Sequence, residues 1–466
     1  MQDKAGIFLG AEFMTVLEHA SGQTGGTADE AVGESTDRWS CVIYAVVLAV
    51  FAFQVYYQAN GISRHMLALA DRHKDLQFLL YPSLIWMGMG LLLLVFRTCV
   101  WMLYRPFPSI DRVAAPPLTV IIPAYNEGAM VRHSIESVVA ADYPRDRLEI
   151  LVVDDGSTDD TWRYIREAAD GHPGLVTALR HDRNRGKREA LALGFRRACG
   201  DIIVTIDSDS VIERNALLAI AGPFRDPKVG AVAGKVLVYN RREGLIPRMM
   251  HVRFVLSFDL VRSVESAYGN VFCCPGALTA LRASAVRPVV DRWLNQKFLG
   301  SRCTFGEDRA LTNCLFEAGY NTVYQRTAVV HTEVPEIYSK LCKMLIRWDR
   351  SYIREEIQFA RIVWKRPLLT RAIALFDRFV NNMRYPVYYG CMGLVFFLAW
   401  HDPRMILRMM VAMGIVSLAN MIYFIRSERS FDFLYGVLYA YFSWFALFWI
   451  FPYALFTVRA RSWLTR

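Results

Sequence analysis

Residues 148–157 read LEILVVDDGS, an apolar run that ends in two carboxylates and a turn. Similar runs occur at 118–125 (LTVIIPAY), 201–209 (DIIVTIDSD) and 229–239 (VGAVAGKVLVY), and the segments between them have the pattern of amphipathic helices. Near-continuous apolar strands that alternate with helices are typical of a mostly parallel sheet buried on both faces. The sequence therefore predicts one α/β domain over residues 115–335, which binds its ligands beyond the carboxyl ends of the strands.

The composition indicates that the chain contains more than this α/β domain. The 466 residues are 54% hydrophobic and 21% charged, which is too apolar for an ordinary soluble protein and too charged for a membrane bundle alone. A soluble domain joined to several membrane spans accounts for both values. The formal net charge of +10 suits nucleic acid, anionic lipid or phosphate-bearing substrates. The apolar segments favour the last two, so no nucleic-acid partner is expected. The cysteines include no CxxC pair, which predicts free thiols in a reducing compartment.

Apolar segments flank the predicted domain on both sides. Residues 1–37 lack the pattern of a signal peptide and are expected to form a flexible acidic tail. Residues 38–104 contain two apolar runs long enough to be transmembrane helices. Residues 336–383 mix aromatic and aliphatic side chains with many Arg and Lys, which favours amphipathic helices at the membrane surface; surface helices of the soluble domain are the alternative. Residues 384–458 predict a second transmembrane region, followed by a tail motif at 459–466.

The last apolar run, residues 431–458, is longer than one crossing needs. About 28 residues of helix would extend roughly 42 Å, against a hydrocarbon core of about 30 Å. Arginines flank the run at both ends, and the positive-inside rule then places both ends in the cytosol. With Gly436, Ser443 and Pro452 as candidate breaks, we predict a broken or re-entrant hairpin; a single tilted span is the alternative.

Carboxylates follow two of the predicted strands. Asp155 stands before Gly156 in a turn, where a carboxylate can accept hydrogen bonds from a nucleoside, although any turn uses the same residue types. Asp207 and Asp209 are two residues apart at a strand end, and such a pair can share a divalent cation with a diphosphate. Lys187 precedes a predicted helix start, which is a suitable place to meet phosphate.

Two further motifs suit an acceptor sugar. Glu307 and Asp308, in GEDR, are candidate catalytic residues, with Asp308 as the general base that removes a hydroxyl proton; a helix N-terminus rich in acidic residues is the alternative. Arg347 and Trp348 are adjacent, and they can grip a diphosphate and stack on a sugar ring. The alternative for this pair is anchoring at the membrane interface.

Together, in this order and spacing, these motifs resemble the processive family-2 glycosyltransferases with a GT-A fold, which include cellulose, chitin and hyaluronan synthases. The finer resemblance is to hyaluronan synthases, through DRWLNQKFLGSRCTFGEDRALTN at 291–313, RWDRSYIRE at 347–355 and FTVRARSWLTR at 456–466. The chitooligosaccharide synthases of nodulation share the GEDR-x-LTN form and are the rival. The resemblance implies a GT-A-type α/β domain inserted between transmembrane helices, with amphipathic interface helices.

The same resemblance implies a role for each motif. Asp155 and Lys187 would bind the uridine of the donor, and Asp207 and Asp209 would hold its diphosphate with Mg²⁺ or Mn²⁺. Arg347 would also contact the diphosphate. On the acceptor side, the implied residues are the base Asp308, the sugar platform Trp348, and Trp463 and Arg466 of the tail motif.

Three positions depart from the family pattern. Met344 stands where the QxxRW motif has Gln, Cys274-Pro275-Gly276-Ala277 replaces the usual SGP segment, and Leu464 stands where the tail motif has Gly. The implied substrate contacts at Met344, Cys274 and Gly276 therefore differ in chemistry from those of the family, since Met cannot make the hydrogen bonds of Gln.

The sequence thus predicts an integral protein of the plasma or inner membrane with a cytosolic catalytic domain. The expected activity is processive, inverting polymerisation of UDP-sugars into a β-linked polysaccharide, namely hyaluronan from UDP-N-acetylglucosamine and UDP-glucuronic acid. The expected partners are these donors, the growing polymer, which leaves through the protein's own channel, and the lipid bilayer. The enzyme alternatives are a chitin-like or other β-glycan synthase and a lipid-linked single-sugar transferase. A transporter or scaffold with an inactive domain is disfavoured, because all three carboxylate motifs are intact.

Overall fold

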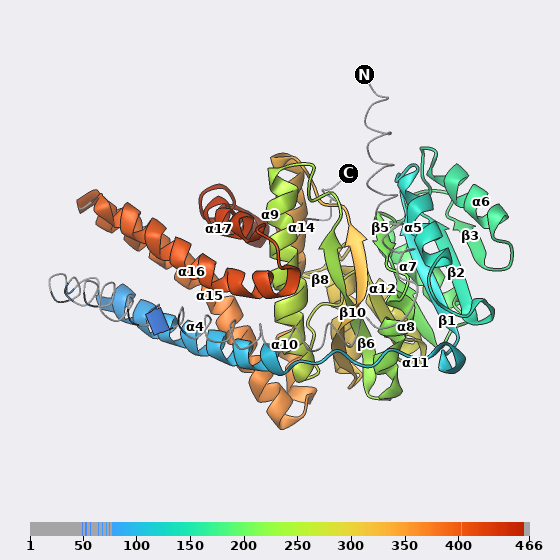
Figure 1. Ribbon diagram of the computed structural model, residues 1–466, viewed down its shortest axis with the longest axis horizontal. Helices are drawn as coiled ribbons and strands as arrows, with labels where there is room; N and C mark the ends of the chain where they lie inside the picture. Colours follow the sequence, from blue (N-terminus) through green and yellow to red (C-terminus); the bar gives the residue numbers. More distant parts are fainter. Residues whose placement is uncertain are drawn as a thin grey trace, which may run out of the picture. The chain divides into compact units, whose positions relative to one another are not determined.

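The apolar runs of the catalytic region become the central strands of one sheet (Figure 1). The computed structural model describes residues 77–401 and 403–460, together with isolated positions before residue 77. The expected tail over 1–37, the first expected span, Trp463 and Arg466 lie outside the described residues. The elements described here belong to one unit, residues 57–466.

The strands are β1 (Leu118–Ala124), β2 (Leu148–Asp154), β3 (Val176–Arg180), β4 (Ile202–Thr205), β5 (Ser210–Ile212), β6 (Val229–Val238), β7 (Thr279–Arg282), β8 (Lys297–Phe298), β9 (Ser301–Arg302) and β10 (Asn321–Thr332). The helices of the α/β region are α5 (Met130–Val139), α6 (Thr161–Gly171), α7 (Lys187–Arg197), α8 (Ala216–Ala221), α9 (Leu245–Val255), α10 (Arg262–Ala267), α11 (Ala283–Val286), α12 (Val290–Leu294) and α13 (Glu307–Glu317). The remaining helices are α4 (Gln77–Leu103), α14 (Tyr338–Ile362), α15 (Leu368–His401), α16 (Arg404–Glu428), α17 (Phe433–Ala446) and α18 (Ile450–Phe456).

The sheet is mixed and mostly parallel, as the sequence predicts. Its order over the described residues is β3-β2-β1-β4-β7-β6-β10-β5. The pairs β3–β2, β2–β1, β1–β4 and β6–β10 are parallel, whereas β7 is antiparallel to both of its neighbours and β5 is antiparallel to β10. Strand β1 is buried along its whole length, which explains why its sequence is continuously apolar rather than alternating.

Helices cover both faces of the sheet, and the two faces have separate hydrophobic cores. On one face, Val120 and Ile122 of β1 pack in a cluster with side chains of α5, α6 and α8. On the other face, Ile121 packs in a cluster with side chains of α7, α12 and α13. Helices α7 and α13, which carry Lys187 and Asp308, therefore lie on the same side of the sheet.

The apolar helices lie beside the α/β region. Helices α4, α15 and α16 run next to one another (Figure 1). Within the described residues, α16 is long and apolar enough to cross a membrane, and the bent pair α17 and α18 would make a second such segment. Helix α15 continues through residues 383 and 384 with Pro386 in its interior, so the end of the predicted interface stretch, from residue 368, and the apolar residues that follow it form one helix. The earlier part of the interface stretch is α14.

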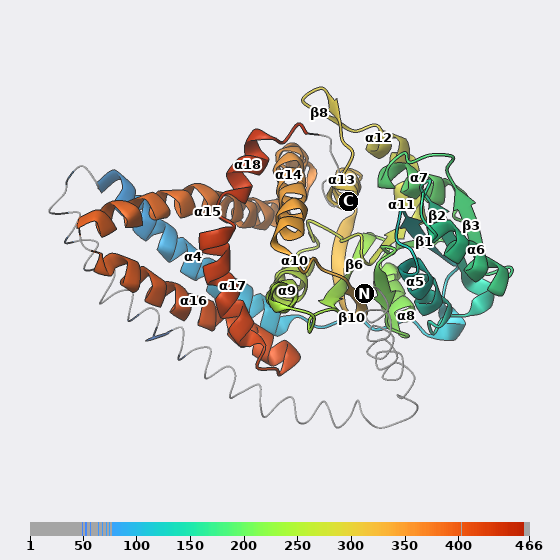
Figure 2. The ribbon, with the colours of Figure 1, turned by 90° about the horizontal axis from the view of Figure 1, so that it is seen from above.

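The run 431–458 is broken, as the sequence predicts, but at another place. Helices α17 and α18 meet at an angle of 51° between Ala446 and Ile450 (Figure 2). Gly436 is instead a packing position, because a Cβ atom there would overlap the side chains of Met421 and Val252. Its lack of a side chain allows α17 to pack closely against α9 and α16.

Both ends of this bent pair are bonded to the catalytic region. Arg248 of α9 donates to the Tyr435 hydroxyl at 2.6 Å near the start of α17. Arg350 of α14 donates to Thr457 Oγ1 at 2.8 Å, just after α18. Both ends of the run therefore lie on the side of the α/β region.

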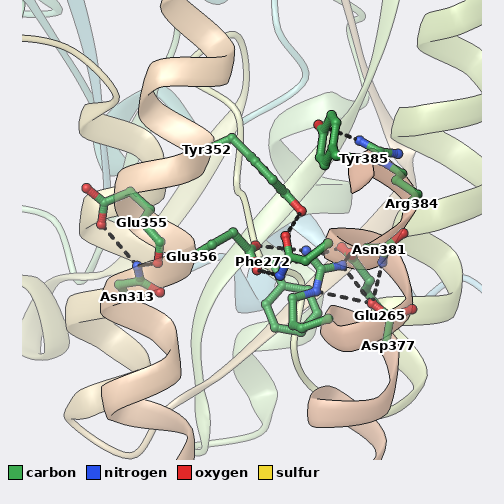
Figure 3. A network of polar contacts seen from close by, with 12 residues as sticks. Glu265, Phe272, Asn313, Tyr352, Glu355, Glu356, Asp377, Asn381, Arg384 and Tyr385 are labelled. Atoms are coloured by element: carbon green, nitrogen blue, oxygen red, sulfur yellow. Dashed lines mark hydrogen bonds and ion pairs between the residues drawn. The ribbon is translucent and has the colours of Figure 1, made fainter. Parts of the chain in front are cut away.

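Buried ion pairs join α15 to the rest of the molecule (Figure 3). The Arg378 guanidinium lies 3.2 Å from Glu265 of α10 and 3.1 Å from Glu356 of α14. Its neighbour Asp377 accepts from Arg97 of α4 at 2.6 Å. Removal of one member of such a cluster leaves a buried charge without its partner, which is costly. The network therefore holds α4, α10, α14 and α15 in one arrangement.

Candidate active site

A cleft with an empty volume of about 410 Å³ opens at the carboxyl ends of β1 and β4. Parallel strands of an α/β sheet commonly bind ligands at this edge. The structure brings six of the residues singled out in the sequence to the walls of this cleft: Lys187, Asp207, Cys274, Gly276, Glu307 and Asp308.

Asp155 holds the loop that leads to Lys187. Its carboxylate accepts hydrogen bonds from the backbone N–H groups of Arg185, at 3.0 Å, and Gly186, at 2.7 Å, while His181 Nδ1 lies 2.8 Å away. Gly156 has a φ of +73°, and a Cβ atom on it would fall 2.5 Å from the backbone of Arg183. The DDGS turn and this loop therefore fit closely together and set the position at which α7 begins.

Lys187 lies between two carboxylates of the cleft. Its Nζ atom pairs with Asp207 and lies 3.2 Å from Glu307 Oε1. Burial acts to lower the pKa of Lys187, but Asp207 and Glu307 raise it well above its ordinary value, so the amine stays charged. A Cβ atom on Gly276 would fall 3.0 Å from both Lys187 Nζ and Asp207 Oδ1, so only glycine leaves this space for a ligand.

Asp207 and Asp209 follow β4 and have a third carboxylate nearby. Burial, Asp207 and Glu127 raise the pKa of Asp209 to about 7. Glu127 accepts a hydrogen bond from Ser208 Oγ at 2.9 Å, and the sequence analysis missed it. Within the residues that the structure describes, no three His, Cys, Asp or Glu side chains are placed to hold a metal ion by themselves. The negative charge gathered here nevertheless fits a divalent cation that takes its remaining ligands from a diphosphate.

Asp308 stands in the first turn of α13, after Gly306 with its φ of +71°. Burial and the neighbouring Glu307 raise the pKa of Asp308 above its ordinary value. Cys273 donates a hydrogen bond from Sγ to Asp308 Oδ2 at 3.3 Å. Cys273 is a second residue that the sequence analysis missed, because no motif marks it.

Arg347 and Trp348 are adjacent on α14, and neither is among the side chains that line the cleft. The positive charge of Arg347 acts to lower the pKa values of Lys187 and Glu307, two residues of the cleft wall. Trp348 is half-buried, with its ring 6.0 Å from that of Phe254. Met344, one turn earlier, is only 6% exposed and belongs to the hydrophobic core against which Trp348 packs.

The C-terminal tail begins next to the loop that carries the candidate base. A smaller pocket with an empty volume of about 210 Å³ is lined by Val458, Arg459 and Ala460 together with Phe305 and Arg354. The described part of the tail therefore approaches the active site from the side of α14.

Comparisons with known proteins agree with this geometry. Residues 119–289 match the model of glycosyl transferase family 2. The hyaluronan synthase of Streptococcus pyogenes is 33% identical over 385 residues, which are 80% of this chain and 88% of that protein. An N-acetylglucosaminyltransferase of Azorhizobium caulinodans is 31% identical over 358 residues, or 75% of this chain and 87% of that protein.

The fold also matches that of a solved enzyme. A mannosyltransferase of Pyrobaculum calidifontis, solved in complex with GDP-Man and Mn²⁺, superposes with a TM-score of 0.55 at 22% identity, covering 78% of this chain and 99% of that one. The α/β region therefore has a GT-A-like fold. By its fold, by the arrangement of its cleft and by these relatives, the chain belongs to glycosyl transferase family 2 and is an enzyme similar to the hyaluronan synthases.

Proposed function

We propose that the chain is a processive, inverting glycosyltransferase that polymerises UDP-sugars into a β-linked polysaccharide. Its proposed product is hyaluronan, made from UDP-N-acetylglucosamine and UDP-glucuronic acid and exported through the protein's own membrane channel. The observation that carries the proposal is the meeting of donor-side and acceptor-side chemistry at one cleft. Lys187, Asp207 and Asp308 all line this cleft, and the positive charge of Arg347 acts on Lys187.

The donor would lie with its diphosphate beside the cations Lys187 and Arg347. Asp207 and Asp209 would hold Mg²⁺ or Mn²⁺, which when bound neutralises charge on the leaving diphosphate. The Mn²⁺ and GDP-Man bound by the mannosyltransferase of similar fold support this donor class. Asp155 contributes through the loop that it holds, because that loop places Lys187.

The acceptor hydroxyl would attack the anomeric carbon from the side opposite the diphosphate. The new glycosidic C–O bond forms while the bond from the anomeric carbon to the diphosphate oxygen breaks, and UDP leaves with that electron pair. Asp308 takes the hydroxyl proton, for which a raised pKa suits it as a base near neutral pH. One displacement inverts the configuration, so α-linked donors give β-linked products.

The surroundings of Trp348 favour an acidic product over a neutral one. Arg253 lies over the Trp348 ring with its guanidinium carbon 5.5 Å from the centroid. Burial raises the pKa of the adjacent Asp349 to about 6, and the positive charges of Arg253, Arg384 and Arg309 act in the opposite direction. Arg309 also has two other carboxylates nearby. Arg253 and Arg384 therefore supply most of the positive charge that would suit the carboxylates of glucuronate units.

The apolar helices support a place in the membrane. Many of their large apolar side chains are exposed, including Phe396 at 61%, Trp400 at 88% and Leu407 at 65%. Such a surface is unfavourable in water and suits lipid. We therefore place these helices in the plasma or inner membrane, with α14 at its surface and the α/β region in the cytosol, where UDP-sugars are made.

Product analysis tests this proposal. The purified protein is incubated with Mg²⁺ or Mn²⁺ and labelled UDP-sugars, singly and in pairs, with Asp308→Asn as the inactive control. We expect long polymer only from UDP-N-acetylglucosamine with UDP-glucuronic acid, and its degradation by a hyaluronan-specific lyase. Chains from UDP-N-acetylglucosamine alone would instead indicate a chitin-like product, and one sugar transferred to lipid would indicate a lipid-linked transferase.

A further inference from the structure

Three successive backbone carbonyls before Asp308 are bound by buried side chains. The Phe305 carbonyl accepts from Arg354 at 2.5 Å and from Arg188 at 3.4 Å. The Gly306 carbonyl accepts from Arg188 at 3.4 Å, and the Glu307 carbonyl accepts from the Trp293 indole at 2.9 Å. These three residues, Phe305 to Glu307, form what we call the base loop, and donors from α7, α12 and α14 hold it.

Arg188 is the most connected of these donors. Its guanidinium also donates to the Trp293 carbonyl at 2.9 Å and to Gln296 Oε1 at 3.0 Å, and it stacks on the Trp293 ring at 5.4 Å. The side chain is 4% exposed. An arginine buried this deeply must bond to several acceptors to offset its loss of water, and here two of the acceptors are carbonyls of the base loop.

A buried network supports the arginines from behind. Gln296 Nε2 and Arg354 Nε both donate to Glu355 Oε1, at 2.9 and 3.0 Å. Asn313 of α13 donates to the other oxygen of Glu355 at 3.0 Å (Figure 3). Gly306 also packs closely against α14, because a Cβ atom on it would overlap Ser351 Oγ.

Arg188 directly follows Lys187 in the chain, and the two side chains contact different parts of the site. Lys187 reaches Asp207 and Glu307 in the cleft, while Arg188 reaches the backbone behind the base. We propose that Arg188 is a positioning residue, which sets the position of Asp308 relative to Lys187, the donor-binding residue at the start of α7. This inference rests on the proposed function, in which Asp308 is the base.

The proposal explains why a guanidinium stands here. A lysine would keep the charge, but its three N–H groups leave from one nitrogen. It could not reproduce the fork in which Nη1 bonds to the Trp293 carbonyl and Nη2 to the Phe305 and Gly306 carbonyls. The base loop would then shift relative to the donor. A displacement of about 1 Å at a reacting group can cost about 10²-fold in rate.

The test measures UDP release by Arg188→Lys under saturating donors. We expect kcat to fall about 10- to 100-fold while the donor KM stays within about twofold of the wild type, because the donor-binding side chains Lys187 and Asp207 are unchanged. The matched control is Arg196→Lys, on the same helix: Arg196 pairs with Asp291 of α12 at 2.6 Å on the surface and does not contact the base loop. It should behave like the wild type.

A second variant keeps the proposal testable if Arg188→Lys does not fold. Trp293→Phe removes the indole N–H that holds the Glu307 carbonyl, together with part of the ring on which Arg188 stacks, and it should lower kcat severalfold. If both residues hold the same loop, the double variant should lose less than the product of the single losses, whereas Arg196→Lys combined with Trp293→Phe should be multiplicative.

Several outcomes would overturn the proposal. These are a kcat for Arg188→Lys within about twofold of the wild type, a rise in donor KM at unchanged kcat, or, where Arg188→Lys does not fold, an unchanged kcat for Trp293→Phe. A wild-type protein that releases no UDP from any UDP-sugar would instead refute the proposed function. The two failures are therefore distinguishable.

Discussion

Cys273 Sγ lies 3.3 Å from Asp308 Oδ2 and donates a hydrogen bond to the candidate base. Burial raises the pKa of Cys273 far above its ordinary value, so the thiol keeps the proton that it donates. Burial and Glu307 raise the pKa of Asp308, whereas Arg309 and the Cys273 hydrogen bond lower it. The thiol therefore stabilises the ionised form of Asp308.

This contact predicts a pH effect. A general base must be deprotonated, so kcat/KM should fall as the pH decreases through the raised pKa of Asp308. Cys273→Ala removes a donor to the carboxylate, raises its pKa further and should move this acid limb to higher pH. Cys273→Ser should keep the limb near its wild-type position. The pH profile of kcat/KM measures the shift, with the exposed Cys199→Ala as control, and an unmoved limb in Cys273→Ala would contradict the contact.

Asp308→Asn should lower transfer by about 10²- to 10⁴-fold, because an amide cannot accept the acceptor's proton. UDP binding should stay close to that of the wild type, since Asp308 does not hold the donor in the proposed site. Isothermal titration with UDP and a rate assay measure the two effects separately. Transfer near the wild-type rate would remove Asp308 from the role of base.

Activity should require a divalent cation. Chelator should abolish UDP release, and added Mn²⁺ or Mg²⁺ should restore it. Without a cation, the carboxylates of Asp207 and Asp209 only add negative charge beside the diphosphate. Asp209→Asn should raise the metal concentration needed for half-maximal activity. The measurement is a metal titration of the initial rate. Full activity in excess chelator would exclude this role for the pair.

Met344→Gln should change product length more than initial rate. Met344 packs in the core that supports Trp348, one helical turn away, so an amide there alters the environment of the sugar platform but not the reacting groups. Gel analysis of product size measures this effect, and Met344→Leu, which keeps an apolar side chain of similar volume, is the control. Identical size distributions for both variants would show that the position does not influence the polymer.

The tail should lie in the cytosol. Arg248 and Arg350 hold both ends of the bent pair α17 and α18 on the side of the α/β region, so the pair should enter and leave the membrane on the same face. A cysteine in place of Ser462, in a background without other cysteines, should react with a membrane-impermeant thiol reagent only after lysis. Labelling of intact cells from outside would show that the last run crosses the membrane.

The sequence predicted those strands that burial on both faces makes continuously apolar. Strands β1, β2, β4 and β6 are apolar runs because they are buried on both faces. Strand β7 has only four residues, TALR, and β10 mixes Gln, Arg and His with apolar residues, so neither produces such a run. Of these two, β7 is antiparallel to both of its neighbours and β10 is parallel to β6, and their positions depend on contacts between distant segments.

The same division holds for the site. Strand-end carboxylates and the GEDR and RW motifs are visible because their chemistry is concentrated in a few adjacent residues. The contacts of Glu127, Cys273 and Arg188 could not be predicted, because each of them reaches segments far away in the chain. Nothing in the sequence indicated that the carboxylate of Asp155, which is expected at the uridine, accepts hydrogen bonds from the backbone of the loop before α7.

The hydrogen bond between Arg350 and Thr457 joins residues that are 107 positions apart in the chain. During synthesis, α14 therefore leaves the ribosome long before the segment that packs against it. The surface of α14 that α18 covers stays exposed during that interval. It follows that a nascent chain that has not yet reached Thr457 still lacks one wall beside the candidate active site.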